Sequence, residues 1–440
     1  MQSFYLNKIV YYIGGALALC FIASYFVPQL YAVASLLLLF LVVAVLIDTL
    51  LVYRKRNGII ATRTTPDRLS IGDVNRISLH LFNNYPYPVS LSIIDELPVQ
   101  FQERNWVRHA SLAGNQGTDI HYEVKPLTRG AYTFHDIQVF VTAPLRLVTR
   151  RFTIPAQKTT KVYPSFVQMR RFQLLAISNR LQEAGVKRSP RLGHSMEFEH
   201  IKEYVRGDDY RTINWKATGR KGNIMVNNYT DERSQQVYCI VNKGRVMKMP
   251  FEGMTLLDYA INASLVLSNI SLVKQDKAGL ITFAENLDSF VPADKRPGHI
   301  SRILETLYQQ ETRFLEADYE KLYTVIRNKI NSRSLLVLFT NFESIESLQR
   351  EMPALKKMAH YHLLLVVIFE NTAIKGLIES SASNLEEVYI KTIAEKFAFE
   401  KRQMIKELQQ NGILGILTTP QQLTVNTINK YLELKNRARI

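Results

Sequence analysis

A dense group of polar side chains lies between Met196 and Arg220, where the sequence reads MEFEHIKEYVRGDDYRTINWKATGR. Its most reactive-looking feature is the pair of adjacent carboxylates at Asp208 and Asp209. Carboxylate oxygens bind hard divalent cations, and paired carboxylates can support metal-dependent hydrolysis. That chemistry also needs further acidic ligands and a phosphate-binding frame, which the sequence does not offer. A metal-dependent hydrolase that uses both aspartates is the first interpretation.

A second interpretation is a metal site built from histidine and glutamate side chains. His194 and His200 flank Glu197 and Glu199. These side-chain types bind transition metals, but their spacing matches no zinc motif.

The third interpretation, which we favour, is a network of charged pairs that fixes an irregular segment against the next domain and serves as a docking surface. Gly207 suits a turn that other residues resist, and Trp215 can pack while its indole donates one hydrogen bond. The candidate docking residues are Glu197, Glu199, Glu203, Tyr204, Gly207, Asp208, Asp209, Arg211, Asn214, Trp215, Lys216, Arg220 and Glu232.

Other reactive motifs are missing from the sequence. There is no CxxC pair, no zinc spacing and no Gly-rich phosphate loop. The two cysteines, Cys20 in an apolar run and Cys239 in a predicted buried strand, are not expected to form a disulfide, which fits a reducing compartment.

The elements that must position the C-terminal residues alternate between strands and helices after residue 234. Short apolar runs predict strands, and apolar residues at helical spacing predict helices, one of them interrupted at Pro353. Such alternation favours a parallel sheet covered on both faces, with ligands at the carboxyl ends of its strands. The predicted strands are 237–241, 278–283, 335–340, 363–369 and 413–418, and the predicted helices are 255–273, 299–309, 319–330, 345–358, 392–410 and 421–434.

A different pattern fills residues 61–163. Ile77, Leu79 and Leu81 alternate with polar residues, as do several later runs, and turn signals separate them. Short alternating strands with such spacing predict an all-β sandwich-like domain, which we interpret as a spacer or interaction module. Residues 164–234 then form a linker that carries the polar segment, and 235–440 form the α/β domain.

The first 57 residues are predicted to form a transmembrane helical hairpin. Two uncharged apolar runs, Ile9 to Val27 and Leu30 to Ile47, are each about long enough to cross a bilayer. Lys8 precedes the first run and Arg54-Lys55-Arg56 follows the second. Because basic residues favour the cytoplasmic side, both termini are expected in the cytoplasm.

The string EFEHIKEYVRGDDYRTINWKATGR, followed by Tyr229 and Glu232, closely resembles the signature of the bacterial domain-of-unknown-function family fifty-eight. The apolar hairpin, the β-rich domain and the C-terminal half also follow that family's layout. The resemblance implies a bacterial inner-membrane protein whose C-terminal half is a von Willebrand factor A-like (Rossmann-like) domain. It also implies a partner, a MoxR-type AAA+ ATPase that assists the assembly or maturation of other proteins.

In von Willebrand factor A domains, a metal-ion-dependent adhesion site binds magnesium through an Asp-x-Ser-x-Ser loop, a threonine and a later aspartate. By the resemblance, Asn242, Gly244 and Val246 stand at the loop positions, Thr255 matches the threonine, and Asn341 stands at the aspartate position. Two carboxylates and two hydroxyls are thus missing, and Lys243 and Arg245 add positive charge. We therefore expect no bound magnesium and no other cofactor.

Three functions follow as hypotheses. The favoured one is a non-enzymatic, membrane-anchored scaffold or adaptor that binds proteins and the lipid bilayer. The second is the hydrolase that uses Asp208 and Asp209. The third is a nucleic-acid-binding protein, suggested by the formal net charge of +16, although no basic-aromatic motif of a known module is present. We expect neither a nucleic-acid partner nor a small-molecule substrate.

Overall fold

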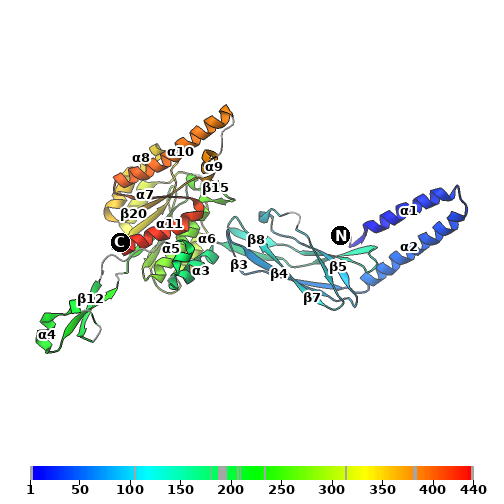
Figure 1. Ribbon diagram of the computed structural model, residues 1–440, viewed down its shortest axis with the longest axis horizontal. Coiled ribbons are helices and arrows are strands. Elements are labelled where there is room, and N and C mark those ends of the chain that lie inside the picture. The colour runs from blue at the N-terminus through cyan, green and yellow to red at the C-terminus, as the bar shows by residue number, and fades with distance from the viewer. Residues whose placement is uncertain are drawn as a thin grey trace. The chain divides into compact units, whose positions relative to one another are not determined.

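The computed structural model describes residues 3–103, 106–178, 180–186, 196–205, 208, 210–231, 234–312, 315–379 and 384–437 (Figure 1). The chain divides into two compact units, Met1–Tyr163 and Pro164–Ile440.

Two apolar helices, α1 (Lys8–Ser24) and α2 (Gln29–Tyr53), pack side by side in the first unit. The more apolar is α2, whose mean hydropathy reaches 3.0 over a window that is 6% buried. Its 25 residues rise about 38 Å at about 1.5 Å per residue, enough to cross a bilayer. The helix α1 is apolar but shorter. The helix Leu256–Val273 is also long and apolar enough to cross a bilayer, but most of it is buried in a core.

The described strands of this unit form three sheets, with strand orders β1-β10-β9-β5-β6, β2-β4-β7 and β3-β11-β8. The predicted alternation is confirmed, since Ile77, Leu79 and Leu81 are all buried. The strand β1 precedes α1 and pairs antiparallel with β10, so the helical hairpin begins and ends within one β-rich unit. The bounds are β1 Phe4–Leu6, β2 Ile59–Thr64, β3 Arg68–Ser70, β4 Asn75–Asn83, β5 Val89–Asp95, β6 Arg108–Leu112, β7 Gly117–Val124, β8 Gly130–Phe134, β9 Ile137–Thr142, β10 Val148–Ile154 and β11 Lys158–Tyr163.

The end of α2 is joined to these sheets by polar contacts. Asp48 is fully buried, and its carboxylate accepts hydrogen bonds from the backbone N–H groups of Leu145, Leu147 and Val148 at 3.0–3.1 Å. Further donors satisfy carbonyl groups at the end of the helix, where no intrahelical partner remains. They are the Tyr85 and Tyr87 hydroxyls, which donate to Val52 and Leu51, and the Arg150 guanidinium, which donates to Val52 and Lys55.

The second unit contains a six-stranded sheet in the order β18-β17-β14-β19-β20-β21. All neighbouring pairs are parallel except β17 and β18. This order is that of a doubly wound sheet, in which the direction of strand progression reverses between β14 and β19. The bounds are β14 Gln236–Asn242, β17 Lys277–Phe283, β18 Leu287–Asp294, β19 Leu335–Phe339, β20 Leu363–Phe369 and β21 Leu414–Thr418, with a separate small hairpin of β15 (Pro250–Phe251) and β16 (Met254–Thr255).

Helices cover both faces of this sheet, as the alternating pattern predicted. One core lies between the sheet and α3, α5 and α11, with α6 at its margin; the other lies beneath α7, α8 and α10. The bounds are α3 Phe166–Ile177, α5 Leu256–Val273, α6 His299–Tyr308, α7 Tyr319–Lys329, α8 Ile345–Tyr361, α9 Thr372–Glu379, α10 Leu385–Gln410 and α11 Leu423–Asn436.

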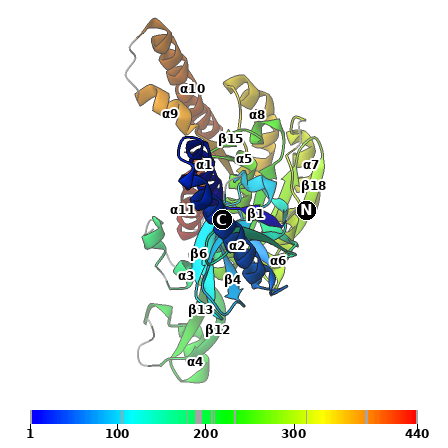
Figure 2. The same cartoon turned by 90° about the vertical axis from the view of Figure 1, so that its right-hand side faces the viewer.

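Several elements differ from the sequence predictions. The helix α8 continues through Pro353 to Tyr361, because a proline inside a helix removes one backbone hydrogen bond without necessarily ending it. The helix α10 begins at Leu385, about two turns earlier than predicted, and pairs with the unpredicted helix α9. Figure 2 shows this helix pair extending past the other elements around it.

The polar segment is not an irregular linker. It forms an antiparallel hairpin of β12 (Met196–Glu203) and β13 (Met225–Asp231), with a bulge between Phe198 and His200. A short helix, α4 (Trp215–Lys221), follows a 3₁₀ turn at the tip of this hairpin. The main contacts of these elements are with one another.

Candidate functional site

Two positions named by the resemblance, Asn242 and Asn341, lie at the ends of the two strands between which the strand order reverses. Asn242 ends β14, and Thr340 and Asn341 directly follow β19, its parallel neighbour. Ligands of doubly wound sheets bind at such carboxyl ends. The structure therefore brings Asn242 and Thr340 together, with the Asn242 amide donating to the Thr340 hydroxyl at 2.9 Å.

A buried tyrosine completes this contact. The Tyr319 hydroxyl lies 2.7 Å from that of Thr340 and accepts from the Asn242 amide at 3.3 Å. Burial raises the pKa of Tyr319, so the phenol stays protonated. The side-chain oxygen of Asn242 in turn accepts a hydrogen bond from the Gly244 N–H at 2.7 Å. Neutral groups that bind one another thus fill the interior of the loop.

The other positions that the resemblance names, Gly244, Val246 and Thr255, have structural roles. A Cβ at Gly244 would lie 3.0 Å from the Asn242 side-chain oxygen and 3.2 Å from a backbone oxygen, so a serine there would need the loop to shift. Val246 is partly buried against the core. Thr255 caps α5, donating to the Asp258 carboxylate at 2.7 Å and accepting from its N–H at 3.2 Å.

The two predicted loop cations do not both add charge to this site. Lys243 is buried, and its ammonium donates to Asp288 on β18 at 2.8 Å, which neutralises it away from the loop. Arg245 is exposed and lies 3.5–3.7 Å from Glu316 and Glu343, while Arg350 pairs with Glu316 at 3.1 Å. The rim of the loop is therefore a balanced set of ion pairs.

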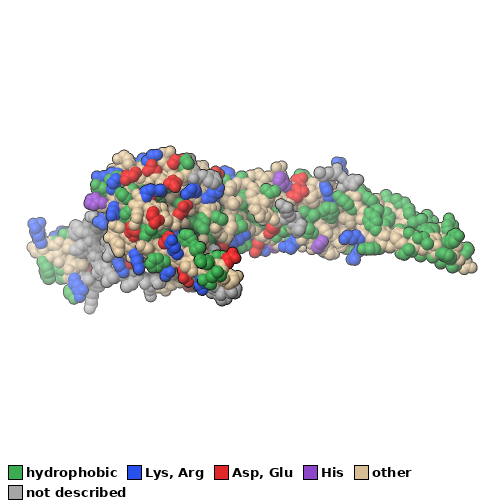
Figure 3. Space-filling view, turned by 90° about the horizontal axis from the view of Figure 1, so that it is seen from above, with side chains coloured by type: hydrophobic (Ala, Val, Ile, Leu, Met, Phe, Trp, Pro, Cys, Tyr) green, Lys and Arg blue, Asp and Glu red, His purple; other side chains and the backbone are tan. Residues whose placement is uncertain are grey.

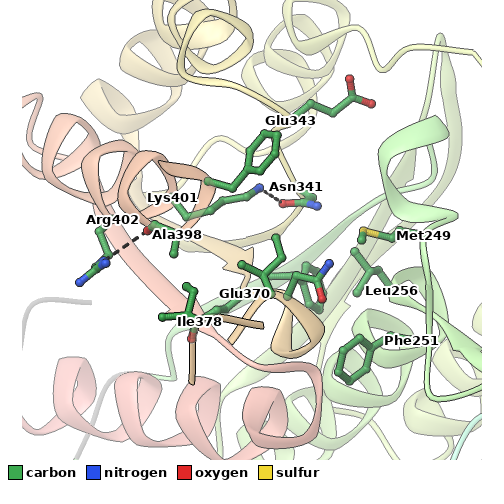
Figure 4. A pocket seen from close by; sticks show the side chains of 14 residues that line it. Met249, Phe251, Leu256, Asn341, Glu343, Glu370, Ile378, Ala398, Lys401 and Arg402 are labelled. Carbon is green, nitrogen blue, oxygen red and sulfur yellow. Dashed lines mark hydrogen bonds between the residues drawn. The ribbon is translucent and has the colours of Figure 1, made fainter. Parts of the chain in front are cut away.

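Lys401, which the sequence analysis missed, supplies a cation at Asn341. It comes from α10, and its ammonium donates to the Asn341 side-chain oxygen at 2.7 Å and to the Phe342 carbonyl oxygen (Figure 4). Burial lowers the pKa of Lys401 to about 8, while Glu343 and Glu400 act in the opposite direction. A signal for it exists in the sequence, because Lys401 lies on the helix face that carries Met404 and Leu408.

A cavity of about 470 Å³ opens beside this lysine. Figure 4 shows Lys401 turned toward Asn341, while Arg402 turns back to the Ala398 carbonyl oxygen. Of the methionines after the loop, Met247 is packed in the core and Met249 lines the cavity. The apolar walls are Met249, Phe251, Leu256, Phe369, Ile374, Ile378, Phe397 and Ala398, and the polar lining is Asn341, Glu343, Glu370, Asn371, Lys401 and Arg402.

The apolar wall continues along α10 beyond the cavity. Tyr389, Ile393 and Phe397 follow one another at four-residue spacing and are all exposed. They run into the face whose later members, Met404 and Leu408, are buried in the core. We call Tyr389, Ile393 and Phe397 the α10 stripe. It is the uncovered continuation of a core-facing helix surface.

The donor set around the loop is poorly suited to a divalent cation. Asn242, Thr340 and Tyr319 contribute no carboxylate, and their polar atoms already bind one another. Within the part of the chain that the structure describes, no group of three or more His, Cys, Asp or Glu side chains could hold a metal ion. The expectation of no bound magnesium stays a prediction.

In the polar hairpin, Asp208 is engaged by its own turn. Its carboxylate accepts from the Val205 N–H at 3.0 Å and the Lys202 ammonium at 2.9 Å, and these contacts lower the pKa of Asp208. Both carboxylate oxygens thus hold the turn, which leaves the hydrolase hypothesis without support at this residue. Asp209, Gly207, Glu232 and His194 lie outside the described residues.

The other docking candidates lie along the hairpin. Asn214 caps α4 by accepting from the Ala217 N–H at 3.0 Å, and Glu203 accepts from Asn223 at 3.3 Å. Trp215, which can pack, is 73% exposed instead. Tyr204, Arg211, Lys216 and Arg220 are exposed as well, and Glu197 and Glu199 lie on β12.

Residues 200–374 match the family model described as "Protein of unknown function DUF58". Over 186 residues the chain is 24% identical to the "Uncharacterized protein YeaD" of Bacillus subtilis (strain 168), a match that covers 40% of this chain and 45% of that relative. The chain thus spans less than half the length of this curated relative.

Two solved structures resemble a quarter of the chain. The CARDB domain of the PF1109 protein from Pyrococcus furiosus matches at 13% identity, over 24% of this chain and 91% of that one, with a TM-score of 0.17. The alpha-2-macroglobulin of Escherichia coli matches at 18% identity, over 24% of this chain and 9% of that one, with a TM-score of 0.19. Scores this low carry no functional argument.

Proposed function

We propose that this protein is a membrane-anchored, non-enzymatic docking protein whose second unit, a von Willebrand factor A-like domain, binds a protein partner at the carboxyl edge of its sheet. The observation that carries the proposal is the cavity of about 470 Å³ and its continuation as the α10 stripe. Exposed apolar surface of this kind marks binding sites more often than it serves the fold.

The anchor in this proposal is the α1–α2 hairpin. Most of its side chains are exposed despite being apolar, which suits a lipid environment. Lys8 stands before α1 and Arg54 to Arg56 follow α2, which favours a cytoplasmic location for both ends in a bacterial inner membrane.

Protein docking suits the site better than catalysis or metal binding. The loop that carries magnesium in von Willebrand factor A domains is closed here by neutral hydrogen bonds, and Lys401 binds the acceptor at Asn341. The lysine ammonium orients these neutral oxygens by hydrogen bonding, in place of the coordination that a metal ion would provide. The edge thereby stays ordered without a metal, which a constitutive docking surface requires.

The partner that fits the α10 stripe is an amphipathic helix. The line from Tyr389 to Phe397 is about 12 Å long at about 1.5 Å per residue, or about two turns of an opposing helix. Helix-in-groove recognition uses apolar anchors at this spacing. The family resemblance suggests that the helix belongs to a MoxR-type AAA+ ATPase.

The test compares two phenylalanines that stand two positions apart on one helix. Phe397 lines the cavity, whereas Phe399 is 61% exposed and does not. We expect a detergent pull-down from native membranes, read by mass spectrometry, to enrich an AAA+ ATPase with wild type and Phe399→Asp but not with Phe397→Asp. Protection of the buried Cys239 thiol from alkylation shows whether each variant is folded.

Two results count against the proposal in different ways. If no AAA+ ATPase is enriched with wild type, the partner is wrong. If Phe397→Asp and Phe399→Asp retain it equally, the surface is wrong.

A further inference from the structure

The tip of the polar hairpin exposes large apolar side chains that its own fold does not use. We define the hairpin tip as residues 210–224. Trp215 is 73% exposed, Tyr210 69% and Ile224 48%. The lobe that holds α4 lies at the left of Figure 1, and in the space-filling view of Figure 3 green apolar and blue basic side chains are visible on it.

The hairpin tip is held together mainly by polar contacts of other side chains, although the Tyr210 ring lies 5.7 Å from the Arg211 guanidinium. Asn214 caps α4, and the Thr218 hydroxyl accepts from the Met225 N–H at 3.0 Å. Among the described residues of the hairpin whose burial is known, the buried ones are Met225 and Val226. Trp215 is thus available to a ligand at no cost to the fold.

The same fifteen residues carry positive charge only. Arg211, Lys216, Arg220 and Lys221 lie between Tyr210 and Ile224, and the sequence has no aspartate or glutamate there. All four are exposed. The neighbouring Asp208 is paired with Lys202 at 2.9 Å, so it does not offset this charge.

We propose that the hairpin tip binds the surface of an anionic lipid bilayer. This inference rests on the membrane anchoring proposed above, because an anchored chain presents the tip to its bilayer at high effective concentration. Tryptophan and tyrosine favour the membrane interface, and lysine and arginine are attracted to anionic headgroups.

Lipid suits the hairpin tip better than nucleic acid does. Both ligands would attract the four basic side chains, and both would accept aromatic rings. Ile224, and Val205 beside the tip, are also exposed, and aliphatic side chains neither stack on bases nor donate hydrogen bonds. They suit the boundary between headgroups and acyl chains. The mixture of aromatic, aliphatic and basic residues is therefore that of an interfacial segment.

The chain carries its own reporter for this contact, since its two tryptophans are Trp106 and Trp215. Trp106→Phe leaves Trp215 as the single tryptophan in the full-length protein. This variant is reconstituted into nanodiscs of phosphatidylcholine alone, or of equal parts phosphatidylcholine and phosphatidylglycerol. We expect Trp215 emission to shift to the blue in the anionic discs, and brominated lipid to quench it.

Two variants with the same change of charge separate the hairpin tip from the rest of the surface. Gln in place of the four tip residues Arg211, Lys216, Arg220 and Lys221 is expected to abolish the blue shift and the quenching. Gln at four exposed basic residues elsewhere in the second unit is expected to leave both intact. The control positions are Lys295, Arg333, Lys356 and Lys406.

Each remaining outcome overturns a stated part of the reasoning. A chain that does not enter nanodiscs refutes the anchor, and with it the proposed function. A chain that enters them but shows the same Trp215 emission in both lipids refutes the hairpin-tip inference alone. If the Trp215 emission maximum is the same in both lipids but shifts when a single-stranded oligonucleotide is added, the hairpin tip binds nucleic acid instead. An equal loss in the control variant shows a general charge effect and also refutes the inference.

Discussion

Replacing Lys401 with methionine should remove a specific pH dependence from the stability of the second unit. Burial lowers the pKa of Lys401 from its ordinary 10.5 to about 8 in the folded protein. Between these values the unfolded chain binds more protons than the folded chain, so the free energy of unfolding rises with pH. A shift of about 2.5 units at about 1.36 kcal/mol per unit gives about 3 kcal/mol across this window.

Below about pH 8 two opposing contributions determine the difference in the free energy of unfolding between wild type and Lys401→Met. Lys401→Met removes the cost of a buried charge, about 3 kcal/mol, but it leaves the oxygens of Asn341 and Phe342 without their donor. Each unsatisfied acceptor costs about 1–3 kcal/mol. Wild type and variant are thus expected to be similarly stable near neutral pH, and wild type to be the more stable near about pH 10.

The buried thiol of Cys239 on β14 reports on this unit alone. Burial raises the pKa of Cys239 to about 12, so it reacts with a maleimide pulse only after the sheet opens. A Cys20→Ser background removes the exposed thiol. Urea midpoints of Cys239 labelling are measured at both pH values for wild type and Lys401→Met. Midpoints that change in parallel with pH would refute the assignment of the window to Lys401.

Two further predictions concern the loop after β14 and the contacts that join the end of α2 to β10 and the loop before it. Calorimetry with magnesium is expected to show no sub-millimolar affinity in the wild-type protein. In Asn341→Asp, the new carboxylate is expected to pair with Lys401 and not to create a magnesium site. Measurable magnesium binding by either protein would contradict this. Asp48→Ala removes an acceptor for three buried N–H groups and should destabilise the contacts between α2 and the segment 145–148 by about 3 kcal/mol or more. Asp48→Asn keeps one acceptor oxygen and should destabilise them less. Hydrogen exchange at Leu145, Leu147 and Val148 should then be about a hundredfold faster, and unchanged exchange would refute the role of the carboxylate.

Sequence patterns predicted the architecture wherever apolar residues formed a continuous run or a regular alternation. The run at Leu335–Phe339 and the alternation through Ile77 and Leu79 each produce a buried strand. The strand Phe4–Leu6 was missed because three residues show no period, and their pairing with β10 is distant in sequence. The start of α10 at Leu385 was missed because its apolar residues face several directions and remain exposed.

The sequence predicted some residues of the candidate site and missed others. The motif resemblance placed Asn242 and Asn341 at adjacent strand ends, where the structure has them. Lys243 was given the wrong role because its partner, Asp288, lies on a strand that the sequence did not predict. Lys401 was missed because one lysine in a charged helix is unremarkable until the apolar face around it is known. The exposure of Trp215 could not be inferred, since tryptophan usually packs.

The insertion of the helical hairpin between β1 and β2 has a mechanical consequence. A single linker would let a domain swivel on its anchor, but here both ends of the hairpin are built into the sheets, and Asp48 and Arg150 tie α2 to β10 and the loop before it. Any tilt of α2 must therefore turn the β-rich unit with it. In the membrane-anchored protein proposed above, a load applied to that unit would therefore reach the bilayer as torque on two helices, whereas a flexible tether would absorb it as slack.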